Sequence, residues 1–245
     1  MLGKLVKYDF KATARIMLPV FAVMVSLSAV FALLIRLRVD NGFIFTLLAT
    51  ALGTTMAGSG IATVVCIANR FYQGLLKNEG YLSFALPVKT STHIGAKLLN
   101  GIIWSVMEGI ALAVCLFIMI LISASSQQLV ELFNDFLELF HLVDMDVIRG
   151  LLNGIGIMMA EMVSSICMIY AAFAVAHLFD KHKGLVIAGF VIIIMTLNSS
   201  ISTTLIDINF DVFTSLWFWY AQALVASTFY LLITWFILDR RLNLE

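Results

Sequence analysis

The sequence predicts an all-α integral membrane protein with six transmembrane helices. Hydrophobic residues make up 62% of the 245 residues and charged residues only 12%, whereas charged residues make up about a quarter of a typical soluble chain. Long runs that are almost free of charge recur along the sequence, and about 20 apolar helical residues are enough to cross the hydrocarbon core of a bilayer. We therefore expect a single transmembrane domain over residues 1–245.

The first fifteen residues, MLGKLVKYDFKATAR, predict a basic amphipathic helix that lies in the plane of the lipid headgroups. At helical spacing the apolar side chains, such as Leu5 and Phe10, separate from the basic ones. The basic residues are Lys4, Lys7, Lys11 and Arg15. We expect residues 1–15 to form an elbow at the membrane interface ahead of the first span; the alternative is a plain soluble extension.

Six apolar runs follow, each long enough to cross the bilayer. They lie near Ile16–Ile35, Phe43–Asn69, Leu98–Ile122, Leu151–His177, Gly184–Ser202 and Leu216–Leu238. The second run contains GTTMAGSG, from Gly53 to Gly60, and such small residues favour close packing between helices in lipid. No signal-peptide cleavage site follows the first run, so we expect the N-terminus to be retained.

The distribution of basic residues predicts the orientation, because loops on the cytoplasmic side carry the excess of Lys and Arg. With both termini in the cytoplasm, most of the 15 basic residues fall on the cytoplasmic side. Only Arg36, Arg38 and Arg149 then lie outside, where acidic residues predominate. We therefore expect a multi-pass protein with both termini inside.

The connection between the third and fourth runs, residues 125–150, is long and acidic. Glu131, Asp135 and Glu138 are spaced i, i+4 and i+7, so they share one face of a helix. Apolar residues cover the remainder of the segment. The pattern predicts an external amphipathic helix on the outer leaflet, or alternatively a lid over an exit path.

Catalytic and metal-binding patterns are missing from the sequence. There is no Gly-rich phosphate-binding loop with its Lys and Ser or Thr. The four His residues have no companion at ligand spacing, and the three Cys residues lie in apolar runs. We therefore expect no catalytic residue, no metal site and no cofactor on this chain.

Two carboxylates lie inside predicted spans. Glu108 and Glu161 each lie ten residues past the start of a span, which is about 15 Å along a helix and close to the bilayer midplane. Intramembrane acids commonly face a bundle interior or a cavity. They indicate either a polar transport path or proton-coupled site, or protonated carboxyls with a packing role. Asn198, near the outer end of the fifth span, either lines the same path or marks the end of that span.

The connection between the second and third spans, residues 70–97, contains NEGYLSFALPVKTSTHIGAKLL. Its mixed apolar and polar residues predict a short helix parallel to the membrane, which Pro87 ends because proline cannot continue the helical hydrogen bonds. The hydroxyls of Thr90, Ser91 and Thr92 then supply a cap for the next helix. Such an elbow, joined to two spans, is suited to receive force from a cytosolic partner.

The stretch from Glu79 to Lys97, EGYLSFALPVKTS followed by Lys97, resembles the cytoplasmic loop of bacterial type 2 ABC exporter permeases. The chain departs from the family at Lys89, where Ser is common, and in its long loop between the third and fourth spans. The resemblance implies a coupling helix that docks on an ATPase subunit. Its residues are Glu79, Gly80, Tyr81, Leu82, Phe84, Leu86 and Pro87.

The resemblance also implies the partners. ATP and Mg²⁺ bind to a dimer of separate cytosolic ATPase subunits, and a second permease, identical or homologous, completes the transporter. The cargo is an amphiphile such as a peptide, an antibiotic or a lipid-like molecule, exported across a bacterial plasma membrane; nucleic acid is not among the partners. The alternatives are a secondary transporter or channel that uses the intramembrane carboxylates, and a scaffold or sensor subunit without transport.

Overall fold

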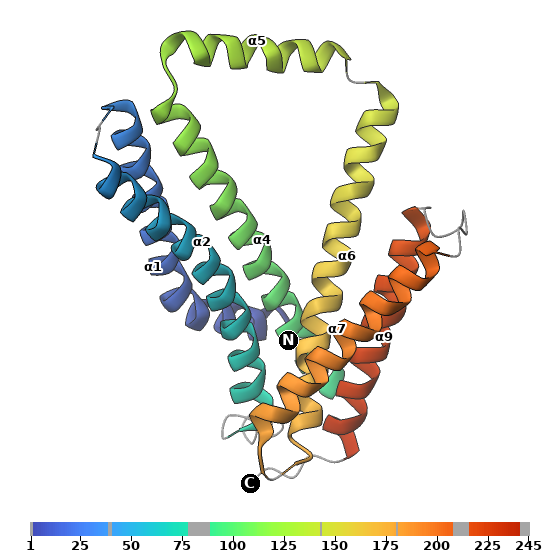
Figure 1. Ribbon diagram of the computed structural model, residues 1–245. Helices are drawn as coiled ribbons and strands as arrows, with labels where there is room; N and C mark the ends of the chain where they lie inside the picture. Colours follow the sequence, from blue (N-terminus) through green and yellow to red (C-terminus); the bar gives the residue numbers. More distant parts are fainter. Residues whose placement is uncertain are drawn as a thin grey trace. The chain divides into compact units, whose positions relative to one another are not determined.

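The computed structural model describes residues 2–38, 41–77, 89–142, 144–179, 181–207 and 216–240. Within these residues all regular structure is helical and no strand occurs, as the composition predicts (Figure 1). The helices are α1 (Leu2–Arg36), α2 (Gly42–Phe71), the π-helix η1 (Tyr72–Leu76), α4 (Thr90–Ser123), α5 (Ser126–Leu142), α6 (Met145–Ala176), α7 (Lys183–Asp207) and α9 (Leu216–Arg240).

Six of these helices are long and apolar enough to cross a membrane. They cover Leu2–Arg36, Gly42–Leu76, Thr90–Ser123, Met145–Ala176, Lys183–Ile201 and Trp217–Arg240. Each predicted span lies within one of these helices, apart from a single residue at one end of the fourth, fifth and sixth spans. The six-span prediction is confirmed, and the chain is a multi-pass membrane protein.

The elbow predicted over residues 1–15 is not a separate helix. α1 is one helix of 35 residues, because residues 10–16 contain no Gly or Pro that would interrupt it. The predicted segregation of side chains is present in part. Leu5, Val6 and Phe10 are half-buried, but Leu2 is exposed, as are the basic residues Lys4, Lys7, Lys11 and Arg15.

The predicted cytoplasmic segment 70–97 is helical at both ends. α2 continues into η1 as far as Leu76, and α4 begins at Thr90. Thr90, Ser91 and Thr92 therefore form the first turn of α4, and the Thr92 N–H donates to the Lys89 carbonyl at 2.9 Å. The predicted coupling residues, Glu79 to Pro87, lie outside the described residues.

The predicted acidic segment 125–150 contains a helix, α5, and also the start of α6. At the beginning of α5 the Ser125 N–H donates to Gln128 Oε1 at 2.9 Å, and the Gln128 N–H donates to Ser125 Oγ at 3.3 Å. This reciprocal pair is a capping box, which fixes the start of the helix. Glu131, Asp135 and Glu138 are all exposed, and so are the apolar residues of α5 between them, so the exposed fractions do not distinguish a polar face.

The helices divide into two compact units. The α6–α9 unit comprises residues up to Asp9, Ile67–Ile102 and the chain from Leu151 onward. The α1–α2 unit comprises Phe10–Cys66 and Ile103–Gly150. Each unit has its own buried core.

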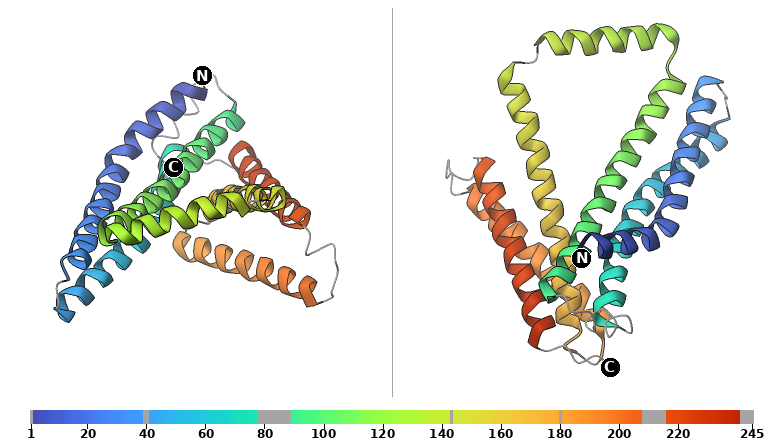
Figure 2. Two further views of the ribbon diagram at one scale, coloured as in Figure 1. Left: turned by 90° about the horizontal axis from the view of Figure 1, so that it is seen from above. Right: turned by 180° about the vertical axis from the view of Figure 1, so that it is seen from behind.

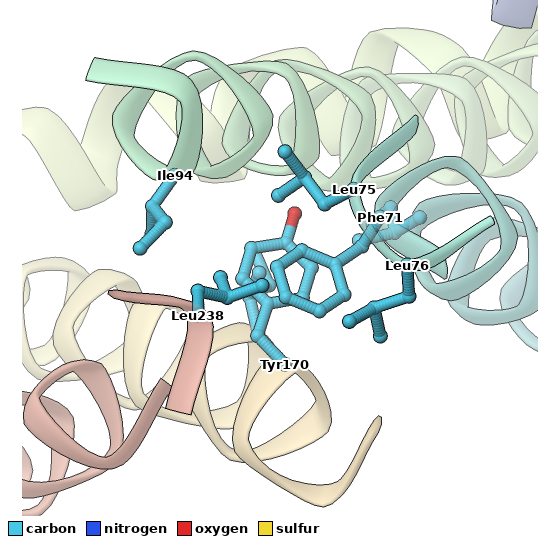
Figure 3. Packing of buried hydrophobic residues seen from close by; sticks show 8 residues of the cluster. Phe71, Leu75, Leu76, Ile94, Tyr170 and Leu238 are labelled. Carbon is cyan, nitrogen blue, oxygen red and sulfur yellow. The ribbon is translucent and has the colours of Figure 1, made fainter. Parts of the chain in front are cut away.

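The core of the α6–α9 unit surrounds Tyr170 (Figure 3). The Tyr170 ring stacks on the Phe71 ring with centroids 4.2 Å apart, and its hydroxyl donates to the Lys97 carbonyl at 2.9 Å. A Cβ atom on Gly101 would lie 3.3 Å from Ile67, Ile166 and Tyr170. The described buried members of this cluster are Ile67, Phe71, Leu75, Leu76, Ile94, Ile166, Tyr170 and Leu238.

In the α1–α2 unit, α1, α2 and α4 run side by side (Figures 1 and 2), and the core that they enclose surrounds Trp104. Trp104 is fully buried and its ring stacks on Phe10 at 4.8 Å. The close packing expected at GTTMAGSG is not found at its glycines, because a Cβ on Gly53, Gly58 or Gly60 would meet no atom within 4 Å.

Candidate functional site

Glu108 lies near the middle of α4 and is buried, with 8% of its surface exposed. Ser59 Oγ donates to Glu108 Oε1 at 2.6 Å, and Thr63 Oγ1 donates to Glu108 Oε2 at 3.0 Å. Ser59 and Thr63 are one turn apart on α2, so their hydroxyls face the same carboxyl group. We call these three residues the Glu108 centre.

Both hydroxyls of the centre have a second acceptor within reach. Ser59 Oγ lies 2.8 Å from the Met56 carbonyl, and Thr63 Oγ1 lies 3.0 Å from the Ser59 carbonyl. A hydroxyl has one proton to donate but two lone pairs with which to accept. Each hydroxyl therefore has two acceptors for its one proton, the Glu108 carboxyl group and a backbone carbonyl of α2. A strong hydrogen bond to one acceptor weakens the bond to the other.

Two methionines of α1 also contact the hydroxyls of the centre. Ser59 Oγ lies 3.4 Å from Met24 Sδ, and Thr63 Oγ1 lies 3.9 Å from Met17 Sδ. Within the described part of the chain the two ion pairs join Lys97 to Asp9 and Arg149 to Asp146, so neither involves Glu108. Among the described residues, the polar contacts of the Glu108 carboxyl group are thus with hydroxyl groups rather than with a cation.

Glu161, the other predicted intramembrane carboxylate, lies on α6 in the α6–α9 unit and is half-buried. Its backbone carbonyl accepts from Ser165 Oγ at 2.8 Å. Its setting therefore differs from that of Glu108, which is buried and bonded through both carboxyl oxygens.

Asn198 lines a cavity of about 320 Å³ between α7 and α9. The wall is mostly apolar and also contains Gln222, whose Oε1 atom is buried and has no hydrogen-bond donor among the described residues. The polar residues in its wall are Asn198, Gln222 and Tyr230. A role of Asn198 in a transport path stays a prediction.

A buried ion pair joins the predicted N-terminal elbow, residues 1–15, to the predicted cytoplasmic segment, residues 70–97. Lys97 Nζ lies 2.7 Å from Asp9 Oδ2 and 2.8 Å from Asp9 Oδ1, and the side chains are only 10% and 15% exposed. The lysine side chain crosses the backbone of η1, because a Cβ on Gly74 would lie 2.6 Å from Nζ. The first turns of α1 are thereby tied to the start of α4.

Sequence reasoning located Glu108 but missed its partners and the Asp9–Lys97 pair. The available signal for the partners was the i, i+4 spacing of Ser59 and Thr63 in a predicted span. No group of three or more His, Cys, Asp or Glu residues capable of holding a metal ion occurs among the described residues.

Comparison of the chain with protein-family models, with curated proteins and with solved structures gave no match.

Proposed function

We propose that this chain is the membrane-spanning subunit of an ATP-driven exporter of the type 2 ABC class. The observation that carries the proposal is the anchoring of the two helix ends that flank residues 78–88. Leu75 and Leu76 at one end and Ile94 at the other are buried in the same cluster (Figure 3). A displacement of the intervening segment therefore acts on α6 and α9, which supply Tyr170 and Leu238 to that cluster.

The sequence between these ends supports the same assignment, because Glu79–Lys97 resembles the coupling loop of that family. In the proposal, Glu79 to Pro87 dock on a dimer of cytosolic ATPase subunits, which bind ATP and Mg²⁺. A second permease copy or a homologue completes the transporter in a bacterial plasma membrane, with both termini cytoplasmic. The cargo is an amphiphile.

The Glu108 centre favours a second candidate, a secondary transporter driven by an ion gradient. Buried acids in membrane helices are typical of such proteins. The two functions differ in their energy source. Cargo uptake into inverted membrane vesicles should require ATP for the exporter and an imposed ion gradient for the alternative.

The exporter proposal is tested by isolating the chain in mild detergent and identifying the proteins that remain bound. We expect a P-loop ATPase, and we expect vesicles reconstituted with both proteins to hydrolyse ATP faster than the ATPase alone. Absence of a bound ATPase, together with uptake that follows an ion gradient without ATP, would refute the exporter and support the alternative.

Leu86→Asp is expected to weaken ATPase binding by about tenfold or more, because a charge placed in an apolar docking contact is costly. Affinity is measured between the purified subunits, alongside unfolding of the isolated variant. Leu37→Asp introduces the same change at a residue that is 70% exposed and should bind normally. Equal affinities for the two variants would contradict docking through this segment.

A further inference from the structure

We propose that the Glu108 centre is a proton-binding site, in which Ser59 and Thr63 change hydrogen-bond partners as the proton enters and leaves. The inference goes beyond the proposed function, since it assigns this chain a ligand of its own. It is independent of the exporter proposal, because coupling to an ATPase requires no intramembrane acid, and it concerns the same centre as the second candidate.

The ionised state is satisfied by the contacts described above. A carboxylate only accepts hydrogen bonds, and each of its two oxygens has a hydroxyl donor, Ser59 at 2.6 Å and Thr63 at 3.0 Å. Hydrogen bonds to a charged acceptor are the strong kind. They offset part of the cost of a charge inside the membrane domain, which amounts to several kcal/mol.

The neutral state can be satisfied without any movement of the backbone. A protonated Glu108 needs an acceptor for its O–H. When Ser59 turns its proton to the Met56 carbonyl, or Thr63 turns its proton to the Ser59 carbonyl, a hydroxyl lone pair becomes available to Glu108. In this step one proton passes from a hydronium ion in the solvent to a carboxylate oxygen, so one O–H bond breaks in hydronium and one forms on Glu108.

The groups around Glu108 indicate that its negative charge is neutralised by a bound proton. Among the described residues, the buried side chains of α1 are uncharged, and they include Met17, Phe21 and Met24 of the cluster around Trp104. The titratable neighbours in the cluster are two thiols, Cys66 of α2 and Cys115 of α4, and the basic Arg15 of α1 is exposed. A centre that alternates between charged and neutral forms in such surroundings does so by binding and releasing H⁺.

The direct test is infrared difference spectroscopy of the full chain in lipid nanodiscs, over about pH 4 to 10, which spans ordinary and strongly shifted carboxyl groups. Wild-type protein should show a carboxylic-acid C=O band that changes with pH. The chain has 15 carboxyl side chains, so Glu108→Gln should remove one component of that band, whereas Glu161→Gln, the matched change in the other intramembrane acid, should retain this component. A band unaffected by Glu108→Gln would overturn the proposal.

A second measurement keeps the test decisive if Glu108→Gln fails to fold. The double variant Ser59→Ala with Thr63→Val removes both donors to the carboxylate and should raise the ratio of protonated to ionised Glu108 about tenfold at a given pH. Thr54→Val, at an exposed threonine of α2 that bonds only to its own helix, should leave the ratio unchanged. An unchanged ratio in the double variant, or a band that responds to Na⁺ at constant pH, would also overturn the proposal.

Discussion

Replacement of Lys97 by Met is expected to lower the free energy of unfolding by about 3 kcal/mol, because the buried Asp9 carboxylate loses the cation beside it. The Asp9 carboxylate is only 15% exposed, and both of its oxygens lie within 2.8 Å of Lys97 Nζ. Water therefore cannot fully replace the lysine. Denaturant unfolding in detergent measures the loss.

Two further variants make this prediction specific to the ion pair. Lys89→Met is the matched control, since Lys89 is an exposed lysine just ahead of the same helix, and it should change stability by less than about 1 kcal/mol. The double variant Asp9→Asn with Lys97→Met removes both charges and should recover at least half of the loss. A double variant that is no more stable than Lys97→Met would contradict the ion-pair explanation.

The six membrane helices could be predicted because the backbone polar groups of a chain inside lipid must form hydrogen bonds within the protein. An apolar run must satisfy its own N–H and C=O groups within the hydrocarbon, and a helix does this internally. Helix ends were less predictable. α6 begins at Met145, six residues before the apolar run at Leu151, because a helix continues into the polar region while nothing stops it. The same reason explains why residues 2–15 are part of α1.

The depth of Glu108 could be predicted from residue counting, but its partners could not. Ser59 is 49 residues from Glu108 and Thr63 is 45 residues away, so the contact depends on which faces of α2 and α4 meet. The glycines around Ser59 suggested close packing, but Gly53, Gly58 and Gly60 face open space. Close approach occurs instead at Gly74, Gly101 and Gly156, and the first two have no small-residue motif in their local sequence.

The Asp9–Lys97 pair illustrates the same limit. The two residues are 88 positions apart, and each has an adequate local explanation, one in an amphipathic helix and the other at the mouth of a span. Opposite charges in separate segments have many possible partners in a chain with 15 basic and 15 acidic residues. The pair depends on the packing of η1 against α4, in which the Lys97 side chain lies against Gly74. This packing cannot be read from the two local sequences.

Replacement of Tyr170 by Ala is expected to cost about 3 kcal/mol or more of unfolding free energy, the range found for large-to-small changes of buried aromatic residues. Tyr170 is 1% exposed, and its removal leaves a cavity between η1, α4 and α9. Because lipid is as apolar as the side chain, the loss reflects missing van der Waals contacts with the Phe71 ring and its neighbours.

Tyr170→Phe distinguishes the contribution of the ring to stability from that of the hydroxyl. It keeps the stack on Phe71 and loses only the bond to the Lys97 carbonyl, so it should cost about 1 kcal/mol. Tyr8→Ala is the matched control, since Tyr8 is 73% exposed, and it should be nearly neutral. All three are compared by unfolding in one detergent. If Tyr170→Ala proves as mild as Tyr8→Ala, the cluster around Tyr170 does not hold the ends of η1 and α4 together, and the observation that carries the exporter proposal is lost.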